Sequence, residues 1–176
     1  MPSQQPLIYT AGENPRGFAA TATALQAIIV DPSERILLLN SPSRGQGWQV
    51  VSGALEAGES ILAGTLRETS EECGGGVIVR PLGTVHAETF RYDENVPYMN
   101  SHFYLLAYER GEVVPGDDMT GSEYRWWRVE ELEAEQPRFH PSTRMELLKR
   151  AVDLYRLWHR EPPSWLQPDL TPASGQ

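Results

Sequence analysis

The sequence predicts a single α/β (α+β) sandwich domain in which helices cover a mixed, curved sheet. Several short apolar runs rich in β-branched residues indicate strands, two stretches carry helical periodicity, and turn-forming residues separate them. A chain of 176 residues suits one domain with a real core. We expect an N-terminal arm at residues 1–18, a domain at residues 19–160 and a proline-rich tail at residues 161–176.

The expected strands begin with a hairpin. Residues 24–30 are largely apolar and residues 36–39 are apolar, and Asp31, Pro32 and Ser33 supply turn chemistry between them. Aromatic and aliphatic runs predict further extended segments at residues 48–51, 77–79, 83–90, 101–108 and 123–129.

Two main helices are expected. The first covers residues 60–73, with a serine at its start and a triple glycine as its stop. The second covers residues 140–158 and carries an apolar stripe formed by Leu147, Ala151, Leu154 and Trp158. The stripe predicts packing against the domain's own core, and docking onto a partner is the alternative.

The composition of the chain limits the kinds of partner and the cellular location that we expect. The formal charge of −9 argues against nucleic acid or an anionic membrane as the main partner, because either favours a basic face. The longest uncharged stretch, residues 17–30, is shorter than the roughly 20 residues of a membrane helix. The N-terminus lacks the basic start and apolar block of a signal peptide, so a cytoplasmic location is expected.

The single cysteine, Cys73, agrees with a reducing compartment. One cysteine forms no intramolecular disulfide and offers no zinc cluster. Its neighbourhood predicts a small, buried side chain.

The first helix concentrates negative charge. On a helical wheel Leu62, Leu66, Thr69 and Cys73 share one side, and Glu68, Glu71 and Glu72 cluster roughly opposite. Carboxylates at this spacing repel one another, and Arg67 is the obvious counterion in the same turn. The cluster therefore indicates a cation site, although a solvated helix face gives the same pattern.

Oxygen ligands favour a hard divalent cation. The segment has no histidine and no cysteine pair, which favours Mg²⁺ or Mn²⁺ over zinc. Such a cation lets an acidic protein hold phosphates. Gly53 and Gly58, before the helix, let the backbone approach a bound group closely.

The spacing of the whole segment resembles the signature of the Nudix hydrolases. Every fixed position is present, at Gly53, Glu59, Arg67, Glu68, Glu71, Glu72 and Gly74. Thr69 and Gly75 stand where the signature expects bulky aliphatic residues, and Ser52 where many members have glycine. None of these departures removes a chemical group. The resemblance covers roughly residues 20–155 and implies that family's α/β/α sandwich.

The resemblance implies hydrolysis of a diphosphate linkage in a small-molecule phosphoanhydride, a nucleoside diphosphate joined to another group or a nucleoside triphosphate. Mg²⁺ or Mn²⁺ and an activated water are implied with it. Carried over by position, Glu71 and Glu72 are expected metal ligands, joined by Glu68 and the backbone carbonyl of Gly53.

The remaining signature residues have implied roles of their own. Glu59 and Arg67 are expected to form an ion pair that fixes the loop against the helix. Members of the family differ in which glutamate takes the proton from water. Glu68 in the signature and Glu123 outside it are the candidates here.

Three residues are candidates for substrate binding. Trp48 and Gln49 before the signature resemble the branch that acts on nucleoside triphosphates and dihydroneopterin triphosphate. Trp48 could stack on a ring or belong to the core. Tyr92 lies at about the distance past the signature where, in part of the family, a tyrosine accompanies dinucleoside polyphosphate substrates, and Arg44 is placed to contact a phosphate or to keep its loop soluble.

Two other classes of function fit parts of the sequence. A non-catalytic nucleotide-metabolite sensor would be expected to have lost glutamates of the signature, and this chain retains them. An interaction protein would use the stripe of the C-terminal helix, which also leaves a homodimer open.

Overall fold

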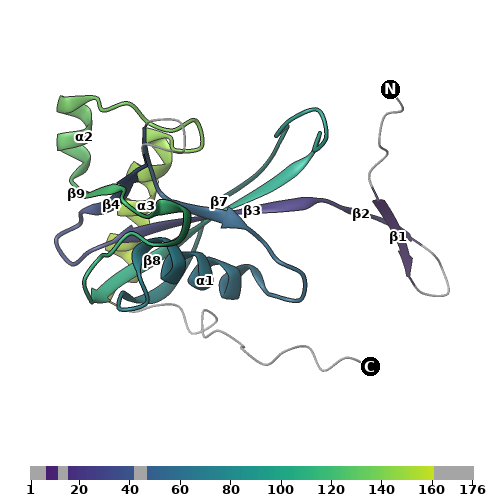
Figure 1. Cartoon of the computed structure of the whole chain (residues 1–176), viewed down its shortest axis with the longest axis horizontal. Helices are drawn as coiled ribbons and strands as arrows, with labels where there is room; N and C mark the ends of the chain where they lie inside the picture. Colours follow the sequence, from purple (N-terminus) through teal and green to yellow (C-terminus); the bar gives the residue numbers. More distant parts are fainter. Residues whose placement is uncertain (1–6, 12–15, 42–46, 161–176) are drawn as a thin grey trace.

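A mixed sheet of seven strands organises the molecule. The computed structural model describes residues 7–11, 16–41 and 47–160. The strand order is β5-β4-β3-β8-β7, with β6 joined to β3 and β9 joined to β4 (Figure 1). Strands β3 and β8 run parallel, and the other pairs are antiparallel. The bounds are β3 Ala22–Val30, β4 Ile36–Asn40, β5 Trp48–Gln49, β6 Val51–Ala54, β7 Ile78–Phe90, β8 Met99–Arg110 and β9 Glu123–Trp127.

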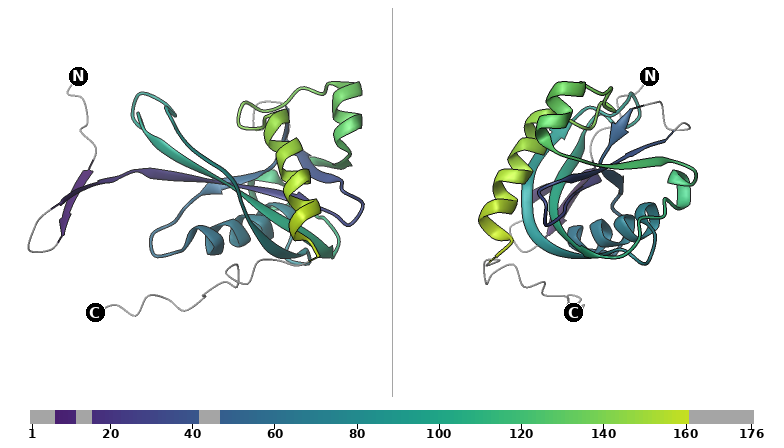
Figure 2. Two further views of the ribbon diagram at one scale, coloured as in Figure 1. Left: turned by 180° about the vertical axis from the view of Figure 1, so that it is seen from behind. Right: turned by 90° about the vertical axis from the view of Figure 1, so that its left-hand side faces the viewer.

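Helices cover both faces of this sheet. The described residues form α1 (Ile61–Cys73), α2 (Val129–Glu135), α3 (Met145–Trp158) and a short 3-10 turn, η1 (Asp117–Met119). Figure 2 shows α1 and α3 on opposite faces, with the curved, open sheet between them. The predicted α/β/α sandwich is confirmed. Among the described residues, no helix is long and apolar enough to cross a membrane.

Strand β3 divides the core into two halves because its side chains alternate between faces. Ile28 and Val30 pack in the cluster that includes residues of α3, whereas Ala27 and Ile29 pack in the cluster that includes Cys73 of α1. The predicted stripe of α3 lies against the first cluster, with Leu147 and Ala151 buried and Leu154 and Trp158 partly buried. The stripe therefore closes the domain's own core.

The run predicted as one strand at residues 48–51 is two. β5 pairs with β4, and β6 pairs with β3. Between them the Val50 N–H donates to Thr143 Oγ1 at 3.3 Å instead of to a neighbouring strand. The break lets β6 lead toward α1.

The C-terminal elements begin and end at different residues from those predicted. The strand predicted at residues 123–129 stops at Trp127, and Val129 begins α2, which was not predicted. The Glu131 carboxylate accepts the Arg128 N–H at 2.8 Å at the start of α2. The helix predicted at residues 140–158 begins at Met145 because residues 141–142 form a turn.

Two hairpins extend from the body (Figure 1). The segments predicted at residues 77–79 and 83–90 form one long strand, β7, whose register shifts between Pro81 and Gly83. With β8 it makes a long hairpin. A second hairpin, not predicted, pairs β1 (Leu7–Ala11) with β2 (Arg16–Ala20); it begins in the expected N-terminal arm and ends two residues beyond it. The expected domain boundaries stay predictions, and the tail at residues 161–176 lies outside the described residues.

Candidate active site

Helix α1 is fixed at both ends. Ser60 Oγ accepts the Ala63 N–H at 3.1 Å, which satisfies one free amide of the first turn. At the other end Gly74 has φ of 93°, and a Cβ there would lie 2.9 Å from the Val114 carbonyl oxygen. The Val114 N–H donates to the Cys73 carbonyl at 2.8 Å, so the loop after β8 is tied to the end of the helix.

The predicted division of α1 into an apolar and a charged face is wrong for Glu72, which is only 1% exposed. Leu62 and Leu66 are half-buried, whereas Thr65 and Thr69 are fully buried. The threonine hydroxyls donate to helix carbonyls four residues earlier, at 2.7 and 2.8 Å. Because the helix satisfies them, these polar side chains can face the sheet.

The buried carboxylate of Glu72 is anchored to the sheet. Its Oε2 accepts the Ser52 N–H of β6 at 3.0 Å. A buried carboxylate is costly unless hydrogen bonds satisfy it, so this contact ties the helix to the strand. It also explains how a charged residue belongs to the buried side of α1.

Gly53, the next residue of β6, lies directly under Glu68. A Cβ at Gly53 would lie 1.9 Å from the carboxyl carbon of Glu68 and 2.0 and 2.1 Å from its oxygens. No side chain fits in that space. Glycine at this position therefore permits the close approach of the Glu68 carboxylate to the strand.

Arg67 joins the loop before α1 to the helix. Its Nε and NH2 donate to the two oxygens of Glu59 at 3.2 and 2.8 Å. Its NH1 donates to Glu68 at 2.8 Å and to Glu71 at 2.9 Å. NH2 also donates to the Ala54 carbonyl at 2.9 Å. The expected ion pair between Glu59 and Arg67 is present, within a larger network.

Glu59, in the loop before α1, is also held closely by its neighbours. The Glu56 N–H donates to Glu59 Oε1 at 2.7 Å, and a Cβ at Gly64 would lie 2.6 Å from the same oxygen. The hydrogen bonds from Arg67 and Glu56 lower the pKa of Glu59 below its ordinary value of 4.5. The bond to Glu59 raises the pKa of Arg67 in turn. Both groups are charged at neutral pH.

Cys73 is buried beside the network, as predicted. Burial, with a smaller effect of the Glu72 charge, raises the pKa of its thiol to about 12. The thiol is therefore protonated at neutral pH and is not a nucleophile.

The donors of this cluster fit a hard divalent cation. Within the described residues, no three acidic, histidine or cysteine side chains converge on one point in this conformation. Glu68 and Glu71, however, already converge on one positive group, the NH1 of Arg67. Oxygen ligands of this kind are those that Mg²⁺ and Mn²⁺ prefer.

A cavity of about 820 Å³ lies beside β6, which is large enough for a nucleotide-sized ligand. Apolar side chains on β7 and β8 form part of its wall, at Phe90, Met99 and Phe103. Polar side chains from several elements complete it, among them Gln26, Gln49, Glu88, Arg91, His140 and Arg144.

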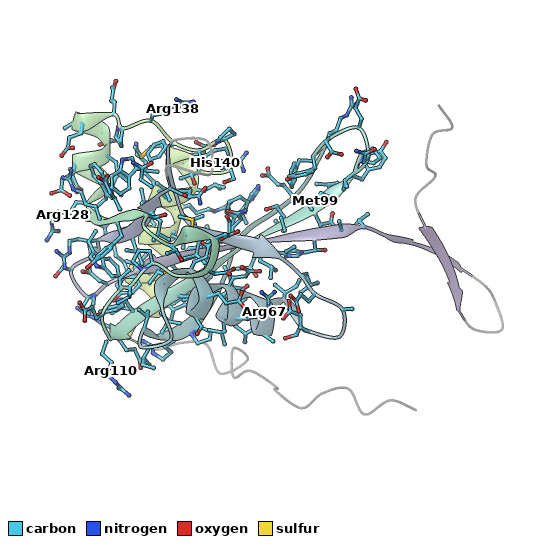
Figure 3. The ribbon with its side chains drawn as sticks, viewed as in Figure 1. Arg67, Met99, Arg110, Arg128, Arg138 and His140 are labelled. Carbon is cyan, nitrogen blue, oxygen red and sulfur yellow. The ribbon has the colours of Figure 1, made fainter. Side chains whose placement is uncertain are left out.

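The cavity and the glutamates of α1 lie on opposite faces of the sheet and meet at β6. Figure 3 shows Arg67 and His140 on opposite sides of the sheet ribbon. Ser52, Gly53 and Ala54 line the cavity, whereas the three glutamates do not. Among the described strands β6 pairs only with β3, so no described strand pairs along its second edge. A ligand crossing that edge would join the two faces.

Of the other predicted site residues that the structure describes, one lines the cavity and two do not. Tyr92 lines the cavity and is 64% exposed. Trp48 does not line it but packs edge-on against Trp127, with ring centroids 5.3 Å apart, which favours the core interpretation. Glu123 is exposed at the start of β9, opposite Asn40, and also lies outside the cavity wall. Arg44 lies outside the described residues.

Several cavity residues were missed from the sequence. Glu88, Phe103, His140 and Arg144 come from three separate segments, so no local motif unites them. Gln26 did carry a signal, because it is the one amide in the apolar run of residues 24–30.

The chain belongs to the Nudix family. The family model described as the NUDIX domain matches residues 21–149, which include every residue of the expected signature.

The structure is similar to solved Nudix folds at low sequence identity. An ADP-ribose pyrophosphatase from Streptococcus suis aligns with a TM-score of 0.60 and 19% identity, over 78% of this chain and 93% of that one. The dihydroneopterin triphosphate pyrophosphohydrolase of E. coli aligns with a TM-score of 0.57 and 18% identity, over 74% and 94% of the two chains. These likenesses show the fold, which is shared across different substrates.

A curated relative matches over a shorter stretch. An octanoyltransferase of Myxococcus xanthus is 43% identical over 67 residues, which make up 38% of this chain and 18% of that protein. The chain therefore spans less than a fifth of that relative's length.

Proposed function

We propose that the protein is a Mg²⁺- or Mn²⁺-dependent pyrophosphohydrolase that cleaves a diphosphate linkage in a nucleoside diphosphate joined to another group, or in a nucleoside triphosphate. The observation that carries this proposal is the approach of the Glu68 carboxylate to Gly53, on a strand that also borders a nucleotide-sized cavity. A phosphate chain bound over β6 would lie close to the Glu68 carboxylate, and the rest of the substrate could enter the cavity.

Glu68, Glu71 and Glu72, with the carbonyl of Gly53, are the proposed metal ligands. A divalent cation, when bound, neutralises phosphate oxygens and favours ionisation of a bound water. The chain's own contribution is position. Ser52 holds Glu72, and Arg67 holds Glu68 and Glu71, so the carboxylates are placed before substrate arrives.

Glu59 and Arg67 serve in this proposal as positioning residues. Both oxygens of Glu59 are engaged by Arg67, and the Arg67 guanidinium reaches the loop, the strand and the helix together. Loss of either side chain would release the loop from α1.

Glu68 is the better supported proton acceptor for water. Its carboxylate approaches Gly53 of β6, a residue of the cavity wall, whereas Glu123 is exposed at the start of β9, and its register partner Asn40 is not part of that wall. A general base has to lie within hydrogen-bond reach of the attacking water, directly or through another water. Tyr92, on the cavity wall, is the proposed contact for the substrate's organic part.

The proposed setting is the cytoplasm, where nucleotide substrates and reduced thiols occur together. The homodimer stays a prediction. Size-exclusion chromatography of the full chain, at several concentrations, tests it.

A substrate panel tests the proposed activity. The purified protein is incubated with and without Mg²⁺ or Mn²⁺, and products are identified by mass. The panel holds nucleoside and deoxynucleoside triphosphates, dihydroneopterin triphosphate, ADP-ribose, nucleotide sugars and dinucleoside polyphosphates. We expect metal-dependent cleavage of one class. Binding without cleavage across the panel would instead support the non-catalytic sensor.

A further inference from the structure

Gln26 holds a polar atom that the protein itself leaves unsatisfied. The side chain is 5% exposed and lines the cavity. Within the described part of the chain, no donor reaches its Oε1. A buried acceptor without a hydrogen bond is unfavourable, so an isolated one needs an explanation.

The neighbouring amide is different. Gln49 is also buried and lines the same cavity, but its Nε2 contacts the sulfur of Met119 at 3.3 Å. The fold thus gives the amide of Gln49 a contact and leaves the Gln26 oxygen without a donor.

The position of Gln26 directs it toward a ligand at β6. In the sheet it lies between Ser52 of β6 and Phe103 of β8, its register partners on the two sides. Gly53, the residue under the Glu68 carboxylate, directly follows Ser52. A molecule with phosphates at Gly53 would place its adjoining group over the face that carries Gln26.

The surrounding side chains fit a flat ring. Phe90, Met99 and Phe103 line the cavity, and Phe90 packs edge-on against Tyr92 with centroids 6.4 Å apart. Aromatic walls bind planar heteroaromatic rings by stacking, without choosing among them. A hydrogen bond from the ring to a buried acceptor would let the site discriminate among such rings.

Two charged side chains of the cavity wall, Arg144 and Glu88, are paired with each other. Arg144 donates to Glu88 at 2.9 Å, and its guanidinium lies 5.9 Å from the Phe103 ring centroid. This cation is therefore balanced by a carboxylate on the same wall. Gln26 is a neutral group of the same wall, and its Oε1 has no donor among the described residues.

We propose that Gln26 is a specificity-determining residue whose Oε1 accepts a hydrogen bond from the exocyclic amino group of the substrate's base, a nucleobase or a pterin. This inference rests on the proposed function for the orientation of the substrate. It goes further by assigning base selection to one residue of β3.

The test pairs a protein change with a ligand change. Gln26→Leu removes the acceptor. Purine riboside 5′-triphosphate is ATP without its 6-amino group, and the 4-deamino analogue of CTP serves in the same way. For the base that the protein prefers, kcat/KM of the wild type should fall about tenfold when the amino group is absent. In Gln26→Leu the two substrates should become equal. Dihydroneopterin triphosphate, measured on both proteins, distinguishes a pterin from a nucleobase.

The melting temperature distinguishes this role from a structural one. If Gln26 only supported the fold, its replacement would lower the Tm. Removing a buried amide whose oxygen lacks a donor in the described part of the chain should leave the Tm of Gln26→Leu unchanged or higher. Gln49→Leu, the matched change, loses a contact and should lower the Tm. A fall in Tm of Gln26→Leu equal to that of Gln49→Leu would overturn the proposal, as would an unchanged amino-group preference.

Binding measurements keep this inference separate from the proposed hydrolysis. Isothermal titration calorimetry without metal measures the binding of AMP, CMP and their deamino analogues to wild type and to Gln26→Leu. A preference for the amino-bearing monophosphate that disappears in the variant supports Gln26 even if no triphosphate is cleaved. Cleavage with equal binding of all four monophosphates by both proteins overturns the role of Gln26 and leaves the enzyme proposal standing.

Discussion

Single residues explain how so many acidic groups share one helix. Glu72 is buried because a backbone amide of β6 satisfies it, and Glu68 packs closely because Gly53 has no side chain. Arg67 donates hydrogen bonds to Glu68 and Glu71 of the helix and to Glu59 of the loop before it. The repulsion expected from the sequence is thereby offset by contacts from three different segments.

Gly53→Ala should damage the site without unfolding the protein. The new Cβ would fall 1.9 Å from the Glu68 carboxyl carbon, so the carboxylate has to move. A displacement of that size at the reacting centre costs about 100-fold in kcat. Steady-state hydrolysis of the best substrate, with circular dichroism as the folding check, measures it.

Gly76→Ala is the matched control for this change. A Cβ at Gly76 meets no atom within 4 Å, so activity should be retained. Equal rates for wild type and Gly53→Ala would contradict the proposed role of the Glu68 position.

At the scale of elements, the sequence predicted α1 well and its surroundings less well. Ser60 and Gly74 mark its ends because capping and positive φ are local properties. The burial of Glu72 depends on a strand 20 residues earlier, which no helical wheel contains. α2 was missed for a similar reason, because a seven-residue helix gives too short a pattern to separate from the strand before it.

The ion pair between loop and helix should give a pH-dependent contribution to stability. The pKa of Glu59 is lowered in the folded state, chiefly by its hydrogen bond with Arg67. A lowered carboxyl pKa stabilises the fold above the ordinary value of 4.5, and this stabilisation is lost as pH falls through the folded value. Glu59→Gln should therefore be less stable than wild type at about pH 6 and approach it at about pH 3.

Urea denaturation at the two pH values measures this difference. Glu133→Gln, on α2, is the control because Glu133 pairs with Lys149 on the partly exposed surface, where such pairs contribute little. A constant difference between wild type and Glu59→Gln across this range would contradict the assigned pairing.

For the whole molecule, the sheet separates two tasks. The proposed metal-binding carboxylates lie on the α1 face and the cavity lies on the α3 face, and the two meet at β6. The signature of α1 is local, so its residues could be found from sequence. The cavity is assembled from distant segments that meet only after folding, so of its wall the sequence singled out only Tyr92 and Gly53 as site residues.

The packing of α3 predicts where stability resides. Leu148 is 1% exposed in the core between α3 and the sheet, so Leu148→Ala should lower the free energy of unfolding by about 2–5 kcal/mol. Leu157, on the same helix, is 70% exposed, and Leu157→Ala should change it by less than about 0.5 kcal/mol. Similar losses for both variants in urea titrations would show that the outer face of α3 is also buried, as in a dimer.

The most direct measurement is the hydrolysis rate of the best panel substrate against Mg²⁺ concentration for wild type, Glu72→Gln and Glu133→Gln, with the Tm of each. Glu72→Gln keeps an acceptor for the Ser52 N–H but loses the charge. Our account predicts metal-dependent turnover in wild type and Glu133→Gln, and a loss of about a hundredfold or more in Glu72→Gln with a similar Tm. A Glu72→Gln enzyme that is folded and close to wild type in rate at saturating Mg²⁺ would contradict the metal site and the mechanism built on it.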